Sequence, residues 1–251
     1  MRIDTGTGTV GINIPTRDLL WQAVTDRLAR GDGFALATVN LDHLVKLRHD
    51  RAFARAYAGQ DFVVADGRPI IWLSGLSRQP VELMPGSDLI LPLARIAAKE
   101  DWPVALLGST DAALAGAAEA LVTQVPGLRV VHCFAPPMGF DPEGDAAEAA
   151  LKDIETSGAR LCFLALGAPK QEILALRGRA LAPSVGFVSI GAGLDFLSGH
   201  QRRAPKLMRA LALEWLWRAL SSPKRLLPRY LACFAILPGL ILQAWRQRHA
   251  R

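Results

Sequence analysis

The chain has 251 residues, 51% of them apolar, so it can bury a sizeable core and does not have the composition of a disordered protein. Its formal net charge of +6 is unevenly distributed. Residues 200–251 carry 11 Lys and Arg and one acid, Glu214, whereas the preceding residues are slightly acidic. A basic segment of this kind favours a phosphate-bearing partner: a nucleotide, a nucleic acid or an anionic membrane.

The three cysteines, Cys133, Cys162 and Cys233, lie far apart within apolar runs and lack metal-ligand spacing. We expect buried thiols in a reducing compartment. The first residues lack the apolar stretch of a secretory signal, so a cytoplasmic location is expected.

Short apolar runs alternate with amphipathic stretches from residue 10 to about residue 199. The runs predict strands at 10–14, 34–39, 62–65, 104–107, 128–134, 161–166 and 185–190. The amphipathic stretches predict helices near 16–30, 42–58, 87–100, 111–124, 143–157 and 170–181. This alternation predicts an α/β fold, with a Rossmann-like, mainly parallel sheet flanked by helices over residues 1–199.

The pattern changes after residue 199, where two or three helices are predicted without intervening strands. Residues 230–245 are almost wholly apolar and are flanked by Arg229 and Arg246. This run is shorter than the roughly 20 residues of a bilayer span, and Pro238 is expected to break it. Residues 200–251 are therefore predicted to form a basic amphipathic appendage lying in the plane of a membrane surface. Packing of the same helix on the core or in an oligomer interface is the alternative.

Several predicted strands end in polar residues, and the carboxyl ends of parallel strands meet at one edge of a sheet. Thr38 and Asn40 close one strand and point the same way, and Asp66 with Gly67 closes the next. A carboxylate at this edge can act on a ligand, or it can cap the helix that begins near Pro69. The sequence leaves both roles for Asp66 open.

The most informative stretch is residues 161–172, in which an apolar strand runs through Gly167 into Lys170, Gln171 and Glu172. Pro169 suits the first turn of a helix, where its missing N–H costs nothing. A polar cluster at the end of a buried strand and the start of a helix is predicted to contact a substrate.

Three further turns precede predicted helices. Residues 86–88 (Gly-Ser-Asp) and 108–110 (Gly-Ser-Thr) can each cap a helix or hold an anion at its free N–H groups. The turn from Gly191 through Gly193 to Asp195 resembles half of a dinucleotide fingerprint, but Phe196 stands where the third glycine belongs. An NAD-dependent oxidoreductase is thus a weaker alternative, as is a non-catalytic module that binds nucleic acid or membrane through the basic segment.

Taken together and in order, these segments resemble the WecG/TagA/CpsF family of glycosyltransferases over nearly the whole chain. The matching segments are Thr38–Asn40, Ala65–Gly67, Gly86–Asp88, Leu107–Gly108, Leu166–Glu172, Gly191–Gly193 with Asp195, Phe196 and Gly199, Arg203–Pro205, Leu213–Trp215 with Arg218, and then Pro223, Arg225, Arg229 and Tyr230.

The resemblance implies inverting transfer of a sugar from a UDP-sugar to a polyprenyl-diphosphate-linked acceptor sugar, on the inner face of the cytoplasmic membrane, in cell-surface polysaccharide synthesis. It implies no cofactor, no metal and no nucleic acid, and it leaves a homo-oligomer possible. Asp66 is implied as the catalytic base. With the residues singled out above, the expected substrate-binding set is Thr38, Asn40, Gly67, Gly86, Ser87, Asp88, Gly108, Gly167, Lys170, Gln171, Glu172, Gly191, Gly193, Asp195, Arg203, Arg218, Arg225 and Arg229.

Inverting transfer agrees with these residue types, because it needs one base for the acceptor hydroxyl and positive charge for the departing diphosphate. Family members often carry an Arg about three residues before the Gly-Ser-Asp turn. Residues 83–85 here are Leu, Met and Pro, so the donor sugar is left open between an N-acetylhexosamine, its uronate and a hexose.

Overall fold

A six-stranded parallel sheet forms the centre of the protein. The computed structural model describes residues 1–200 and 223–249. The strand order is β4-β3-β8-β7-β5-β6, and all five neighbouring pairs are parallel. The strands are β3 (Phe34–Val39), β4 (Phe62–Ala65), β5 (Val104–Gly108), β6 (Val130–Phe134), β7 (Leu161–Ala165) and β8 (Gly186–Ser189). The predicted α/β, Rossmann-like fold class is confirmed.

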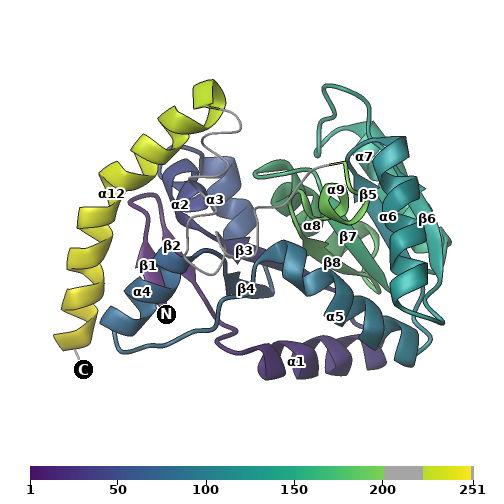
Figure 1. Cartoon of the computed structure of the whole chain (residues 1–251), viewed down its shortest axis with the longest axis horizontal. Coiled ribbons are helices and arrows are strands. Elements are labelled where there is room, and N and C mark those ends of the chain that lie inside the picture. Colours follow the sequence, from purple (N-terminus) through teal and green to yellow (C-terminus); the bar gives the residue numbers. More distant parts are fainter. Residues whose placement is uncertain (201–222, 250–251) are drawn as a thin grey trace.

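Helices connect the strands and cover both faces of the sheet (Figure 1). They are α1 (Arg17–Ala29), α2 (Leu41–Leu47), α3 (Arg51–Ala58), α4 (Arg68–Leu76), α5 (Gly86–Lys99), α6 (Asp111–Gln124), α7 (Asp145–Thr156), α8 (Lys170–Leu181), α9 (Gly193–Leu197) and α12 (Pro223–His249). Side chains of α1, α5 and α6 share one apolar cluster with the strands. Side chains of α7 and α8 share a second cluster on the other face, and α2, α3, α4 and α12 enclose a third.

Strand alternation sends successive side chains of β3 to these different clusters. Phe34 and Leu36 join the cluster under α1, α5 and α6, whereas Ala35 and Ala37 join the clusters on the opposite side. Every residue of β3 is buried, as expected for a strand covered on both faces.

Two predicted elements differ from the structure near the amino end. The run at 10–14 was expected in the main sheet, but β2 (Thr9–Gly11) instead pairs antiparallel with β1 (Arg2–Asp4). The predicted helix at 42–58 is two helices, because the Asp50 side chain accepts the backbone N–H of Phe53 at 2.9 Å and caps α3 separately.

The C-terminal helix α12 is continuous for 27 residues. The predicted break at Pro238 is wrong, since this proline lies inside the helix and on its exposed side, where the missing N–H leaves no unsatisfied group in the core. The segment Leu226–His249 is long and apolar enough to cross a membrane by length and composition, with a mean hydropathy of 1.5.

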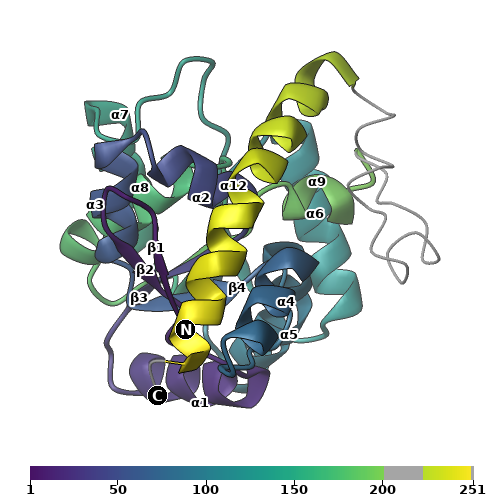
Figure 2. The ribbon, with the colours of Figure 1, turned by 90° about the vertical axis from the view of Figure 1, so that its left-hand side faces the viewer.

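The two faces of α12 have different surroundings. Its inner face is buried against the domain, where the helix lies over α2, α4 and β1 (Figure 2). Its outer face is exposed and still apolar. The buried residues are Leu226, Cys233, Ile236, Leu240 and Ala244, and the exposed apolar residues are Leu227, Leu231, Phe234, Ile241, Leu242 and Trp245.

Candidate functional site

Asn40 and Asp66 meet at the carboxyl edge of the sheet. They follow β3 and β4, whose last residues, Val39 and Ala65, are paired. Asn40 Nδ2 donates to Asp66 Oδ2 at 3.1 Å, and Asn40 Oδ1 accepts from the backbone N–H of His43 at 3.1 Å. Because Asn40 also caps α2, its amide has one fixed orientation, and it presents its N–H to the carboxylate.

Asp66 is not the cap of α4. The N-cap residue is Gly67, which has a φ of 87° and makes no side-chain capping bond. The capping interpretation of Asp66 is therefore wrong, and its half-buried carboxylate belongs to the pair with Asn40. A positive φ lets Gly67 turn the chain sharply just after the carboxylate.

Thr38 is buried beneath this pair, and its carbonyl oxygen accepts from two side chains. One donor is the Tyr57 hydroxyl and the other is His43 Nδ1, at 2.6 Å. Burial lowers the pKa of His43 to about 4, so the ring is neutral at pH 7. Since the carbonyl can only accept, Nδ1 carries the proton, and the ring supports the end of β3 as an uncharged donor.

The turn between β7 and α8 brings Lys170, Gln171 and Glu172 together, with Pro169 as the N-cap residue just before the helix. All three polar side chains are engaged inside the protein. Gln171 Nε2 donates to Glu172 Oε1 at 2.8 Å, and Gln171 Oε1 accepts the backbone N–H of Gly191 at 3.1 Å. Lys170 Nζ donates to the carbonyl of Phe140 at 2.6 Å. The turn thus connects two neighbouring loops at the same edge.

Glu172 is completely buried. Burial raises its pKa from 4.5 to about 7, against the hydrogen bond from Gln171 and the charge of Lys46, which lower it. Its Oε2 has no hydrogen-bond partner among the described residues. Gln60 of the α3–β4 connection donates to the Glu172 carbonyl at 3.0 Å and fixes the first turn of α8.

A second group of residues lies at the end of β5. The chain leaves β5 towards β6 and leaves β7 in the opposite direction, so the gap between these neighbours is the topological switch point where α/β sheets bind ligands. Gly108 has a φ of 119°, and a Cβ there would lie 2.4 Å from the carbonyl oxygen of Ala165. The Ser109 hydroxyl donates to Asp195 of α9. Thr110 caps α6, as one of the two interpretations of this turn predicted.

The Gly-Ser-Asp turn starts α5 directly. Its N-cap residue is Pro85, so Ser87 and Asp88 lie in the first turn and the expectation that either caps the helix is wrong. A Cβ on Gly86 would lie 2.9 Å from Ile190 Cα, and one on Gly193 would lie 2.5 Å from Ile90 Cδ1. These two glycines allow α5 and α9 to pack closely at the end of β8. Gly167 and Gly191 supply positive φ angles in the neighbouring turns.

The arginines expected to face a diphosphate fall into two groups. Arg203 and Arg218 lie outside the described residues. Arg225 and Arg229 belong to α12, and Arg229 Nε lies 2.9 Å from Asp42 Oδ1 of α2. Sequence reasoning missed Asp42, although its spacing to Lys46 is that of an ion pair on one helical face.

Sequence reasoning also missed Tyr57 and Gln60, and their roles depend on burial that no local pattern reveals. Among the residues with described positions, no group of three or more His, Cys, Asp and Glu side chains is placed to share a metal ion.

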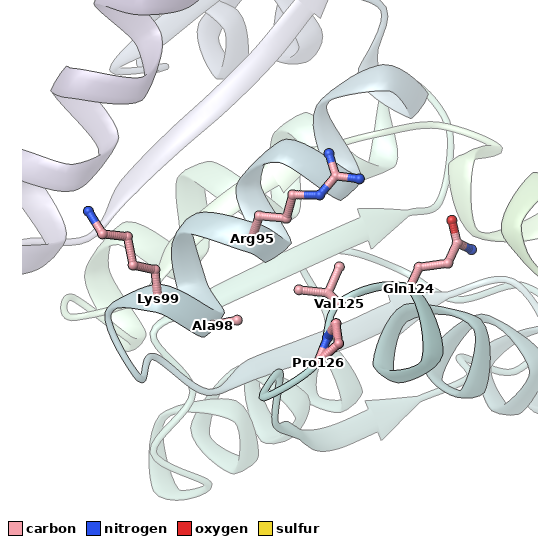
Figure 3. Close-up of a pocket in the computed structure, with 6 residues that line it drawn as sticks. All are labelled: Arg95, Ala98, Lys99, Gln124, Val125 and Pro126. Carbon is pink, nitrogen blue, oxygen red and sulfur yellow. The ribbon is translucent and has the colours of Figure 1, made fainter.

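Neither of two surface hollows is lined by Asn40, Asp66 or Ser109. One, of about 370 Å³, is lined by Arg95 and Lys99 of α5 and by residues 124–126 at the end of α6 (Figure 3). It lies near the opposite edge of the sheet, where these helices end. The other, of about 520 Å³, lies between the β1–β2 turn and α3.

The sequence profile of the glycosyl transferase WecG/TagA/CpsF family matches residues 8–251. The chain belongs to this family. The match includes the sheet domain and α12, and it covers the turns that bring Asp66, Asn40 and Gln171 to one edge. A WecG/TagA/CpsF protein is a glycosyltransferase of cell-surface polymer synthesis, so this activity replaces the oxidoreductase and the non-catalytic module as the function of the chain.

Proposed function

We propose that this protein transfers a sugar, with inversion, from a UDP-sugar to an acceptor sugar carried on a polyprenyl diphosphate, without a metal ion. Asp66 is the base. As the acceptor hydroxyl oxygen bonds to the anomeric carbon, its proton passes to the Asp66 carboxylate. The bond between the anomeric carbon and the β-phosphate oxygen breaks, and UDP leaves with its electron pair.

The hydrogen bond from Asn40 to Asp66 is the observation that carries this proposal. A donor held at 3.1 Å stabilises the ionised carboxylate and fixes its direction, as a base that must accept a proton in one geometry requires. A base in place contributes a factor of about 10² to 10⁴ to the rate.

The donor is proposed to extend along the carboxyl edge from Asp66 towards Ser109. The strand order β4-β3-β8-β7-β5 puts Ser109 three strand spacings, or about 14 Å, from Asn40 and four spacings, or about 19 Å, from Asp66. This span suits an extended nucleotide sugar. The sugar would then lie at the Asn40–Asp66 end, and the nucleoside at the switch point between β5 and β7.

The departing diphosphate needs positive charge. The proposed sources are Arg203, Arg218 and Arg225 of the C-terminal segment, together with the backbone N–H groups at the start of α5. Arginine suits this role because its planar donors pair with phosphate oxygens in two places at once.

A lipid-linked acceptor explains the exposed apolar face of α12. Since the inner face is part of the core, the helix is proposed to lie flat on the cytoplasmic surface of the membrane, with its outer face in the interfacial layer. Lys and Arg near both ends of the helix favour anionic lipids.

The enzymatic test is a panel of UDP-sugars assayed with short-chain polyprenyl diphosphate acceptors, with and without EDTA. Release of UDP that requires both substrates and survives EDTA supports the proposal. Transfer only from another nucleotide sugar, or loss of transfer with EDTA, contradicts it.

The membrane test is flotation with vesicles containing anionic lipid. The double variant Leu231→Ser, Trp245→Ser is expected to lose about 2 to 5 kcal/mol of binding free energy, because two large apolar side chains no longer leave water. Its melting temperature should stay that of the wild type, since both residues are exposed. Undiminished flotation would place the membrane contact elsewhere.

A further inference from the structure

A chain of three polar contacts links α12 to the turn between β7 and α8. Arg229 Nε lies 2.9 Å from Asp42 Oδ1, and Lys46 Nζ lies 2.9 Å from Asp42 Oδ2. Lys46 Nζ also donates to the carbonyl oxygen of Ala168 at 3.1 Å. The contacts therefore run from the C-terminal helix through α2 to the residue two positions before Lys170.

Asp42 is the centre of this chain and is largely shielded from water, since its side chain is 10% exposed. Each of its carboxylate oxygens has its own cation. Removing either cation leaves the poorly solvated Asp42 carboxylate with one cation instead of two. The ion pairs are therefore most stable when all three charged groups are in place. The ring of the adjacent His43 is neutral and adds no charge to the group.

We infer that Arg229 and Asp42 are positioning residues, which fix α12 against α2 and, through Lys46, hold the turn that carries Lys170, Gln171 and Glu172. Arg229 lies within ion-pair distance of Asp42, although its Nε makes no hydrogen bond to a described residue, so its charge serves a different role from that of the arginines proposed to bind the diphosphate. The kinetic test of this inference rests on the proposed UDP-sugar reaction, whereas the hydrogen-exchange test does not.

The turn between β7 and α8 can pass a change at Ala168 on to other parts of the carboxyl edge. Gln171 connects it to Gly191 at the end of β8, and Lys170 connects it to the loop containing Phe140. A displacement at Ala168 would therefore reach both of these loops. In this way, seating of α12 on the domain is coupled to the shape of the carboxyl edge.

Hydrogen–deuterium exchange on the full-length protein tests the coupling directly. Asp42→Asn and Arg229→Gln should each raise exchange in peptides covering residues 166–173 and 223–233 by about tenfold. The double variant should exchange no faster than either single variant, because both break the same chain. Arg229→Lys should restore part of the protection, since it keeps the charge.

Lys152→Gln is the matched control. It removes an exposed ion pair of similar length, 2.8 Å, on α7, and should leave both peptides unchanged. If Asp42→Asn does not fold, Lys46→Gln breaks the same chain one link further on. The inference fails if exchange at 166–173 does not respond to Asp42, Lys46 or Arg229, or if the effects of Asp42→Asn and Arg229→Gln add.

Calorimetric titration with UDP and steady-state kinetics separate positioning from phosphate binding. Positioning predicts that Asp42→Asn and Arg229→Gln lower kcat by a similar factor of about ten, with UDP affinity changed less than threefold. If Arg229 instead bound the diphosphate, Arg229→Gln alone would weaken UDP tenfold or more, and Asp42→Asn would not. Absence of UDP binding in the wild type would refute the proposed donor, while the exchange measurements would still decide the coupling.

Discussion

The carboxyl edge of the sheet holds two pairs of a carboxyl group and an amide, and the two pairs differ in their surroundings. Asn40 donates to Asp66 at 3.1 Å, and Gln171 donates to Glu172 at 2.8 Å. Asp66 is half-buried, whereas Glu172 is completely buried. The comparison teaches that exposure distinguishes two uses of a carboxyl group. The half-buried Asp66 can take a proton from a substrate, as proposed, whereas the buried Glu172 shapes the protein around it.

The largest expected effect is on turnover. Asp66→Asn should lower kcat by about 10²- to 10⁴-fold, because an amide cannot accept the acceptor proton. The fold and UDP binding should persist, as shown by circular dichroism and calorimetry. Glu172→Gln is the matched control, and its kcat at pH 6 should lie within about threefold of the wild type. Equal losses in the two variants would remove the distinction between the pairs.

The next effect is on stability and concerns Glu172. Its pKa of about 7 lies above its ordinary value of 4.5, so the unfolded chain gives up this proton first as the pH rises. The folded state therefore loses stability between pH 4.5 and pH 7, by about 3 kcal/mol in total. Glu172→Gln abolishes this loss, so the variant should gain about 3 kcal/mol relative to the wild type between pH 4.5 and pH 8.

Urea unfolding at several pH values measures this difference. The comparison with wild type matters because His43 contributes the opposite slope: its lowered pKa costs stability as the pH falls from 6.5 to 4. An identical pH dependence in both proteins would mean that Glu172 is ionised and compensated in the folded state.

The smallest effect concerns Asn40. Asn40→Asp keeps an oxygen that caps α2 but replaces the amide donor with a second carboxylate beside Asp66. Stability should change by less than about 1 kcal/mol, whereas the acid limb of the pH–rate profile should move up by about one unit, because a like charge raises the pKa of the base. Asn40→Ala loses both contacts and should unfold about 1 kcal/mol more easily. An unshifted pH–rate profile in Asn40→Asp would mean that residue 40 does not influence the pKa of the base.

The sheet was predictable because its strands are short apolar runs with clear ends. The runs at 34–39 and 62–65 have the limits of β3 and β4, and the ends of α6 and α8 also agree. The amino-terminal hairpin was not predictable in this way, because strands of three residues leave too little pattern to distinguish a hairpin from a sheet strand.

The sequence predicted where the residues of the candidate site lie on the sheet, but not which contacts their side chains make. Sequence pattern placed Asn40, Asp66 and Gln171 at the ends of parallel strands, and the structure has all three at that edge. It could not reveal that Gln171 and Glu172 point into the protein, since their partners Gly191 and Gln60 are distant in the chain. Pattern also favoured a break at Pro238, because it cannot tell on which side of a helix a proline will lie.

The last turn of α12 is bonded to the amino-terminal strand β1. Gln247 Nε2 donates to the Arg2 carbonyl at 2.7 Å, so this end of the helix and the amino terminus share one corner of the molecule (Figure 2). From Arg229 to Gln247 the helix rises about 27 Å, so this corner is remote from Asp42 and the strand ends. An affinity tag or a surface tether attached at this corner would therefore lie away from Asn40 and Asp66, and a linker from residue 249 to residue 1 would need only a few residues.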